Sequence, residues 1–151
     1  MQTACKLTSH ANLFLQASDK QVKAALVAMG MQAEGHAKVE LTNVHERIDT
    51  GLLRNSITWA LSGESANISS YSGDNPSRRN PNGEIPKGTY AGQAPEAKEH
   101  NFAVWIGTNV EYATYVHDGT IKMAANKFIK NAITRYRKEY KQIAKEYLKG
   151  A

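Results

Sequence analysis

The 151-residue sequence contains one cysteine, Cys5, and this scarcity excludes two common ways of stabilising a small protein. A single cysteine cannot form a disulfide within its own chain, and it cannot supply a zinc site built from cysteine ligands. His10 is the nearest histidine along the sequence, so a Cys–His pair remains an alternative. We favour the simpler interpretation, in which Cys5 is a free thiol without a catalytic role.

Long apolar runs are also missing, since no segment approaches the roughly 18 apolar residues that a membrane span needs. Residues 1–16 carry a single basic residue, Lys6, and a short apolar patch at 13–15 that is too short for a secretory signal. We therefore expect a soluble protein that is made and kept in a cytoplasm and has no membrane partner.

The residues that usually carry catalysis are scattered along the chain. His36 and His45 lie nine positions apart on one expected helix, more than two turns, and cannot share a metal ion through local spacing. His117 and Asp118 could form part of a catalytic group, but no serine or cysteine lies in a recognisable nucleophile motif. The glycines form neither a dinucleotide-binding motif nor a P-loop motif. The sequence therefore predicts no metal, no cofactor and no enzymatic activity.

One tripeptide, Asp49-Thr50-Gly51, matches the catalytic sequence of aspartic proteases. That chemistry needs two carboxylates sharing a proton, so a single copy would require a symmetric dimer. The tripeptide also follows a long predicted helix, whereas the protease fold would place it among strands. We favour the interpretation that it ends the helix, with Gly51 permitting a sharp reversal of the chain.

The remaining sequence predicts an α+β fold in a single domain over residues 1–151, with residues 1–17 as a leader. Apolar residues at steps of three and four predict a long helix over 19–46, capped by Ser18 and Gln21. A helix this long cannot easily bury its whole apolar stripe against so small a domain, which indicates a subunit interface. Gly30 and Gly35 would mark places of close packing.

Alternating residues then predict a strand over 56–62, and a second strand over 101–108 that is covered on both faces, giving one small antiparallel sheet. All four prolines fall between them, in residues 64–100, which we interpret as a long flexible arm that becomes ordered against a partner. A short helix capped by Asn109 and stopped by Gly119 follows, and a last helix covers 127–148.

Positive charge is concentrated at the C-terminus, where residues 127–151 contain eight basic residues and two acidic ones. Five of the basic residues would form one face of the last helix, opposite its apolar stripe. A face of this kind can bind DNA without regard to sequence, or it can simply be solvated. The residues expected to face DNA are Arg135, Lys138, Lys141, Lys145 and Lys149.

Three segments together resemble a family of minor structural proteins of long-tailed bacteriophages, known as neck, head–tail joining or tail-completion proteins. Residues 48–57 are similar to the family pattern D-T-G-x-L-R-x-S-I. Residues 106–116, with Gly119 and Thr120, resemble V-G-T-N-V-x-Y-A-x-Y-V-E-x-G-T, although His117 replaces the usual glutamate. Residues 126–133 resemble R-P-F-L-R-P-A-L, with asparagines in place of both prolines. The resemblance spans about residues 19–149, and the 64–100 arm is long for the family.

The resemblance implies a virion protein, synthesised in the host bacterial cytoplasm, that assembles as a ring, expected to be six-fold, between capsid neck and tail. Its implied partners are further copies of itself, a portal-side connector or stopper protein, and a tail terminator or tail tube protein. Packaged DNA in the channel is a further expected contact. We predict that assembly uses Asp49, Thr50, Gly51, Arg54, Arg78, Arg79, Tyr112 and Tyr115. The alternative function is a non-sequence-specific DNA-binding module.

Overall fold

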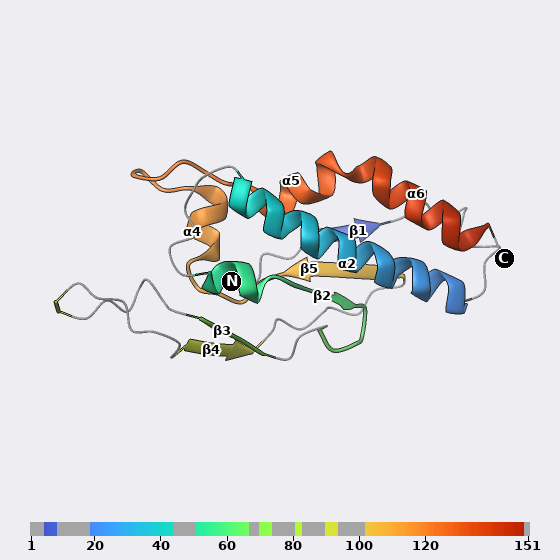
Figure 1. Cartoon of the computed structure of the whole chain (residues 1–151), viewed down its shortest axis with the longest axis horizontal. Helices are drawn as coiled ribbons and strands as arrows, with labels where there is room; N and C mark the ends of the chain where they lie inside the picture. Colours follow the sequence, from blue (N-terminus) through green and yellow to red (C-terminus); the bar gives the residue numbers. More distant parts are fainter. Residues whose placement is uncertain are drawn as a thin grey trace.

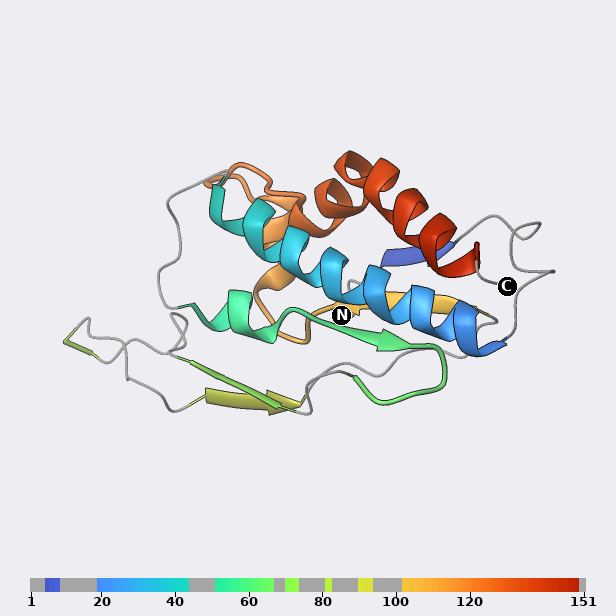
Figure 2. The same cartoon turned by 45° about the vertical axis from the view of Figure 1, so that its right-hand side comes forward.

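A long helix lies across a small antiparallel sheet, with two further helices beside it (Figures 1 and 2). The structure is a computed structural model, and it describes residues 5–8, 19–43, 51–66, 70–73, 81–82, 90–93 and 102–149. Its elements confirm the predicted α+β fold, with a long helix in the N-terminal part, antiparallel strands, a short helix and C-terminal helices.

The long helix is α2 (Asp19–Asn43), and residues 44–46, the end of the predicted range, lie outside the described residues. The predicted stripe is buried, because residues three or four apart fall on one face of a helix. It packs against the sheet and against the C-terminal helices. The buried stripe consists of Val22, Leu26, Met29, Ala33, Ala37 and Leu41.

The sheet has three antiparallel strands in the order β1–β5–β2. The central strand is β5 (Ala103–Gly107), and it pairs with β2 (Thr58–Leu61) on one side and β1 (Cys5–Thr8) on the other. Trp59 lies opposite Ile106 and Leu61 opposite Val104, so these four side chains share the face that α2 covers. The strand β1 lies within residues 1–17, the predicted leader, for which no strand was predicted.

The predicted arm, residues 64–100, also contains regular structure. Two short strands, β3 (Ser70–Gly73) and β4 (Tyr90–Gln93), pair with each other as a separate antiparallel ladder next to helix α3 (Leu52–Ser56). Tyr71 of β3 is buried in the main core. The β3–β4 ladder is thus a second, two-stranded sheet inside the predicted arm, which the sequence did not indicate. One buried tyrosine among glycines and serines gives too weak a periodicity to be recognised from sequence.

Two boundaries of the predicted first strand and short helix also need correction. The predicted strand 56–62 begins two residues later, because Ser56 is the last residue of α3. The short helix α4 (Ala113–Asp118) begins after Tyr112, so Asn109 is not its cap. The residue at the helix start is Tyr112, which makes no side-chain capping hydrogen bond, and before it the Thr108 hydroxyl oxygen accepts a hydrogen bond of 3.2 Å from the backbone N–H of Val110. Gly119 does end α4, with a φ of 80°.

The predicted last helix is two helices, α5 (Phe128–Arg135) and α6 (Arg137–Leu148), which meet at Tyr136. Just before the break, the Thr134 hydroxyl donates to the carbonyl oxygen of Lys130 at 2.9 Å, a backbone contact that bends helices. The hydroxyl of Tyr140 donates across the break to the carbonyl oxygen of Ala132 at 2.9 Å.

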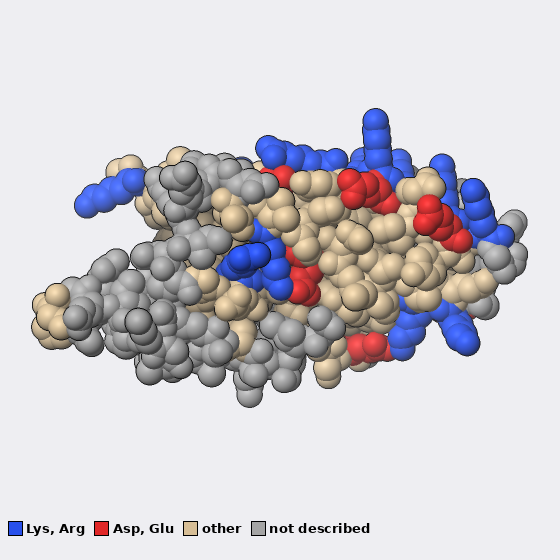
Figure 3. Space-filling view, viewed as in Figure 1, with Lys and Arg blue, Asp and Glu red and all other residues tan. Residues whose placement is uncertain are grey.

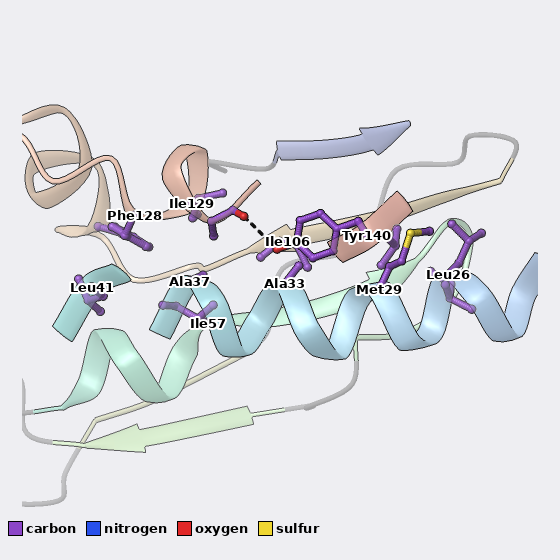
Figure 4. Packing of buried hydrophobic residues seen from close by; sticks show 14 of the residues in the cluster. Leu26, Met29, Ala33, Ala37, Leu41, Ile57, Ile106, Phe128, Ile129 and Tyr140 are labelled. Atoms are coloured by element: carbon purple, nitrogen blue, oxygen red, sulfur yellow. Dashed lines mark hydrogen bonds between the residues drawn. The ribbon is translucent and has the colours of Figure 1, made fainter. Parts of the chain in front are cut away.

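The hydrophobic core lies between α2, the sheet and the pair α5–α6 (Figure 4). Ala33 and Ala37 let the ring of Tyr140 and the side chains of α5 approach α2 closely. Ile106 from β5 and Ile57, which precedes β2, close the opposite side. The largest fully buried side chains are Phe128, Leu52, Ile57, Ile106 and Ile129.

Candidate functional site

The three segments that carry the phage resemblance meet in one corner of the molecule. Ser56 from the first segment lies beside Thr108 from the second, with 2.5 Å between the two hydroxyl oxygens, and both residues are buried. Asn126 begins the third segment, and its backbone N–H donates to the carbonyl oxygen of Val116 in the second at 2.9 Å. The Asn126 side-chain amide also reaches the carbonyl oxygen of Leu41 at 3.5 Å, which ties the third segment to α2.

The hydroxyl pair belongs to a directional chain of hydrogen bonds. The Val110 N–H donates to Thr108 Oγ1, and the carbonyl oxygen of Leu53 accepts from Ser56 Oγ at 2.7 Å. Since each hydroxyl has one proton, the Thr108 hydroxyl must donate to Ser56 Oγ for both outer bonds to form. The chain ties the end of α3 to the turn after β5. These positions of the resemblance therefore support the architecture.

Gly51 and Arg54, the two predicted assembly residues of the first segment that the structure describes, have different roles. Gly51 has a φ of 73°, a left-handed conformation that favours glycine and allows α3 to start there, which confirms its predicted turn. Arg54 is exposed in the last turn of α3. In the second segment, Tyr112 packs on the core and Tyr115 is 62% exposed. The other four predicted residues, Asp49, Thr50, Arg78 and Arg79, lie outside the described residues.

The predicted DNA-facing set is split by the break between α5 and α6. Arg135 belongs to α5, where its Nη1 lies 2.9 and 3.1 Å from the two carboxylate oxygens of Glu40, a buried residue of α2. Arg135, which was predicted to face DNA, is thus paired with a carboxylate while its side chain stays 60% exposed. The Glu40 carboxylate compensates the charge of Arg135. Because Glu40 lies on a different helix, the sequence of α5 alone does not indicate this partner.

The other basic residues of α6 lie together on the side of the helix away from α2, and all are exposed. Figure 3 shows this arrangement, with basic side chains projecting beyond α6 and acidic ones between them and α2. We call this set the α6 basic edge. It consists of Arg137, Lys138, Lys141, Lys145 and Lys149.

His36 on α2 is the central residue of a polar cluster. From the sequence, His36 was considered only as a possible metal ligand. Its ring stacks on Tyr136 with centroids 3.6 Å apart and planes 7° from parallel. Its Nδ1 lies 2.8 Å from the hydroxyl oxygen of Tyr140, and its Nε2 lies 3.2 Å from a carboxylate oxygen of Glu139. The spacing of Tyr136, Glu139 and Tyr140 was a signal for this cluster, because residues three and four apart share a helix face.

Burial lowers the pKa of His36 from its ordinary value of 6.5, and the carboxylates of Glu139 and Glu40 act in the opposite direction. Burial likewise raises the pKa of the Tyr140 hydroxyl, which stays protonated and donates. When neutral His36 donates from Nε2 to Glu139, its Nδ1 can accept from Tyr140 only if the single hydroxyl proton of Tyr140 is donated there and not to the Ala132 carbonyl oxygen. A protonated His36 would donate at both nitrogens, leaving the Tyr140 proton to the Ala132 carbonyl oxygen.

The outward side of α2 carries apolar or small residues instead of charges. Met31 is 61% exposed and Val39 is 43% exposed, and Gly35 lies between them on the same side. A helix covered on one side normally has a polar opposite side. The sequence held a signal here, because Ala24, Ala28, Met31, Gly35 and Val39 form a second stripe at steps of three and four.

Within the described parts of the chain, no group of three or more histidine, cysteine, aspartate or glutamate side chains is placed to hold a metal ion. Among the described helices, none is long and apolar enough to cross a membrane. No protein-family model matches the chain, and comparisons with curated proteins and with solved structures find no match either.

Proposed function

We propose that this chain is a structural protein of a tailed-phage virion, and that it assembles as a ring connecting the capsid neck to the tail. Its partners in this proposal are its own copies, a portal-side connector or stopper, and a tail terminator or tail tube protein. The observation that supports the proposal most is the junction of the three resemblance segments. Ser56 of the first segment contacts Thr108 of the second, and Asn126 of the third bonds to Val116 of the second, with Ser56, Thr108 and Asn126 all buried.

The surface of the molecule is also of the kind that assembly uses. An uncharged band follows α2 across one broad face, with acidic side chains along both of its edges (Figure 3). Exposed apolar side chains occur there and at Tyr115 and Ile121. A contiguous apolar surface with a polar rim is typical of protein–protein interfaces.

The test is to purify phage particles and measure whether this chain is present at a fixed number of copies, by quantitative mass spectrometry. Particles lacking the protein should then be examined by electron microscopy. Full heads beside loose tails would support a joining role, and tails of aberrant length or ending would support a completion role. Normal infectious particles that lack the chain would contradict the proposal.

A second candidate function, sequence-independent DNA binding, is favoured by the α6 basic edge. Lys138, Lys141 and Lys145 are exposed on one side of α6, where phosphates could approach. The triple reversal K138E/K141E/K145E should abolish salt-sensitive binding to duplex DNA. The reversal K127E/K130E, at the start of α5, is the control of like charge and should weaken binding much less. A wild-type chain that fails to bind at low salt would exclude this function.

A further inference from the structure

The α2 outer face, which we define as Ala24, Ala28, Met31, Gly35 and Val39, has room for an incoming side chain. A Cβ atom built on Gly35 would meet no atom within 4 Å, so the surface is open at this point. Met31 projects one turn before Gly35 and Val39 one turn after it, and both are exposed. The face therefore presents apolar or small side chains to solvent, with open space above Gly35.

A second exposed apolar feature is the turn between α4 and α5, residues 119–125. Ile121 at its tip is fully exposed, more so than any other large apolar residue of the described chain. The turn is held in shape by two backbone hydrogen bonds. The Thr120 N–H donates to the Met123 carbonyl oxygen at 2.8 Å, and the Met123 N–H donates to the Thr120 carbonyl oxygen at 3.1 Å. The turn that carries Ile121 is therefore a structured projection at the end of the molecule opposite the C-terminus (Figure 1).

Gly119 shows how closely this turn is packed at its base. Its φ of 80° suits glycine, and a Cβ there would lie 2.7 Å from the backbone nitrogen of Ala125 and 2.9 Å from the Met123 carbonyl oxygen. The two ends of the turn therefore touch, which limits its freedom to fold back and cover Ile121. An isoleucine held in water in this way gains free energy when another surface covers it.

The charges at the edge of the α2 outer face indicate which kind of partner would bind it. Glu139 and Glu146 of α6 are exposed along one edge of the face, and Glu146 has only the neutral Gln142 amide as a partner in the described structure. Beside Ile121 in the turn stands Lys122, which is also exposed. An apolar tip with an adjacent cation thus matches an apolar face with an acidic edge.

We infer that the 119–125 turn of one copy of this chain docks on the α2 outer face of the next copy. Ile121 packs over Gly35 between Met31 and Val39, and Lys122 faces the acidic edge. The inference rests on the proposed function in that it identifies the contact between neighbouring subunits of the ring. The turn lies at one end of the molecule and the face on its broad side, so each copy uses both surfaces with different neighbours. Such head-to-tail contacts form rings when their rotation closes.

Two variants test the two sides of this contact, one in the turn and one in the α2 outer face. Ile121→Asp removes the apolar tip, and Gly35→Arg places a long charged side chain in the middle of the face, where the added Cβ meets no atom within 4 Å. Each should weaken self-association at least about tenfold, measured by sedimentation velocity and native mass spectrometry over a range of concentrations. Gln32→Arg, at an exposed position of α2 outside the α2 outer face, and Phe102→Asp, at an exposed apolar residue outside the turn, are the controls, and both should assemble like the wild type. Circular dichroism and thermal melting verify that every variant is folded.

Mixing the two defective variants is the decisive experiment. The Ile121→Asp chain keeps an intact α2 outer face, and the Gly35→Arg chain keeps an intact turn. Equal amounts should form a one-to-one heterodimer that grows no further, because its remaining turn and face are both blocked. Monomers in the mixture, or an Ile121→Asp chain that assembles like the wild type, would overturn the inference.

The same measurements distinguish a failure of the docking contact from a failure of the proposed function. A wild-type chain that assembles while Ile121→Asp makes no difference overturns the docking contact and leaves the ring proposal intact. A wild-type chain that stays monomeric at high concentration overturns the docking contact as well. The proposed function is then decided independently by the composition of purified particles.

Discussion

Arg135 of α5 holds the carboxylate of Glu40 on α2 through a single nitrogen, Nη1, which lies 2.9 and 3.1 Å from its two oxygens. The carboxylate side chain is 5% exposed and the arginine side chain is 60% exposed. The pair therefore combines a carboxylate removed from water with a cation still largely in it. The arginine compensates the buried charge and fixes the position of α5 on α2.

Replacing Arg135 with alanine should destabilise the fold by about 1–2 kcal/mol, because Glu40 would keep a buried charge without its main partner. The estimate is below that for a fully buried pair, since the guanidinium is already solvated. Arg137→Ala is the control, because Arg137 is an exposed arginine two residues away on the α6 basic edge. Urea unfolding should show a clear loss for Arg135→Ala and a change within about 0.5 kcal/mol for Arg137→Ala. Equal losses would contradict this assignment.

The hydroxyl pair of Ser56 and Thr108 makes a prediction about coupling. Ser56→Ala and Thr108→Val should each cost about 1–3 kcal/mol, because each leaves a buried hydrogen-bonding group without its partner. The double variant should cost less than the two single losses added together, since the second substitution removes the group that the first left unpaired. Chemical denaturation of all four proteins measures this difference. Strict additivity would mean that the two hydroxyls do not depend on each other.

Local periodicity was sufficient to predict the main helix and the central strand. The stripe from Val22 to Leu41 repeats every three to four residues, and β5 is a short run of apolar residues, so both elements reflect their own sequence. The ends of elements were less predictable. Ser56 reads as the start of a strand but ends α3, because its hydroxyl bonds back to Leu53 and across to Thr108. Contacts between remote segments decide such boundaries.

The candidate site was predictable only in part for the same reason. The motif segments could be found in sequence, and Gly51 could be assigned to a turn, but their meeting point depends on the tertiary fold. Arg135 seemed to belong to a free basic face because its partner, Glu40, is 95 positions away. The His36 cluster likewise combines residues of α2 with residues of α6, so neither helix alone indicates it.

The two glycines of α2 should respond in opposite ways to alanine. A Cβ on Gly30 would lie 2.8 Å from Val104 Cγ2 and 2.9 Å from two ring carbons of Trp59, in the buried contact between α2 and the sheet. Gly30→Ala should therefore destabilise the protein by about 1–3 kcal/mol. Gly35→Ala meets no atom and replaces a poor helix former, so it should stabilise the protein by about 0.5–1 kcal/mol. Thermal unfolding of the two variants tests the contrast, and a gain for Gly30→Ala would refute it.

Acid should weaken the packing of α2 on α6 through His36. Because burial holds the pKa of folded His36 below 6.5, the unfolded chain binds more protons than the folded chain near pH 6. The stability that neutral His36 contributes is therefore present above about pH 6.5, and it is lost as the pH falls through the lowered pKa of the folded state. His36→Asn removes this titration and keeps a polar side chain beside Tyr140. Free energies of unfolding measured between about pH 5 and pH 8 should fall less steeply towards acid in His36→Asn than in the wild type. Parallel curves would show that the other titrating groups account for the acid sensitivity.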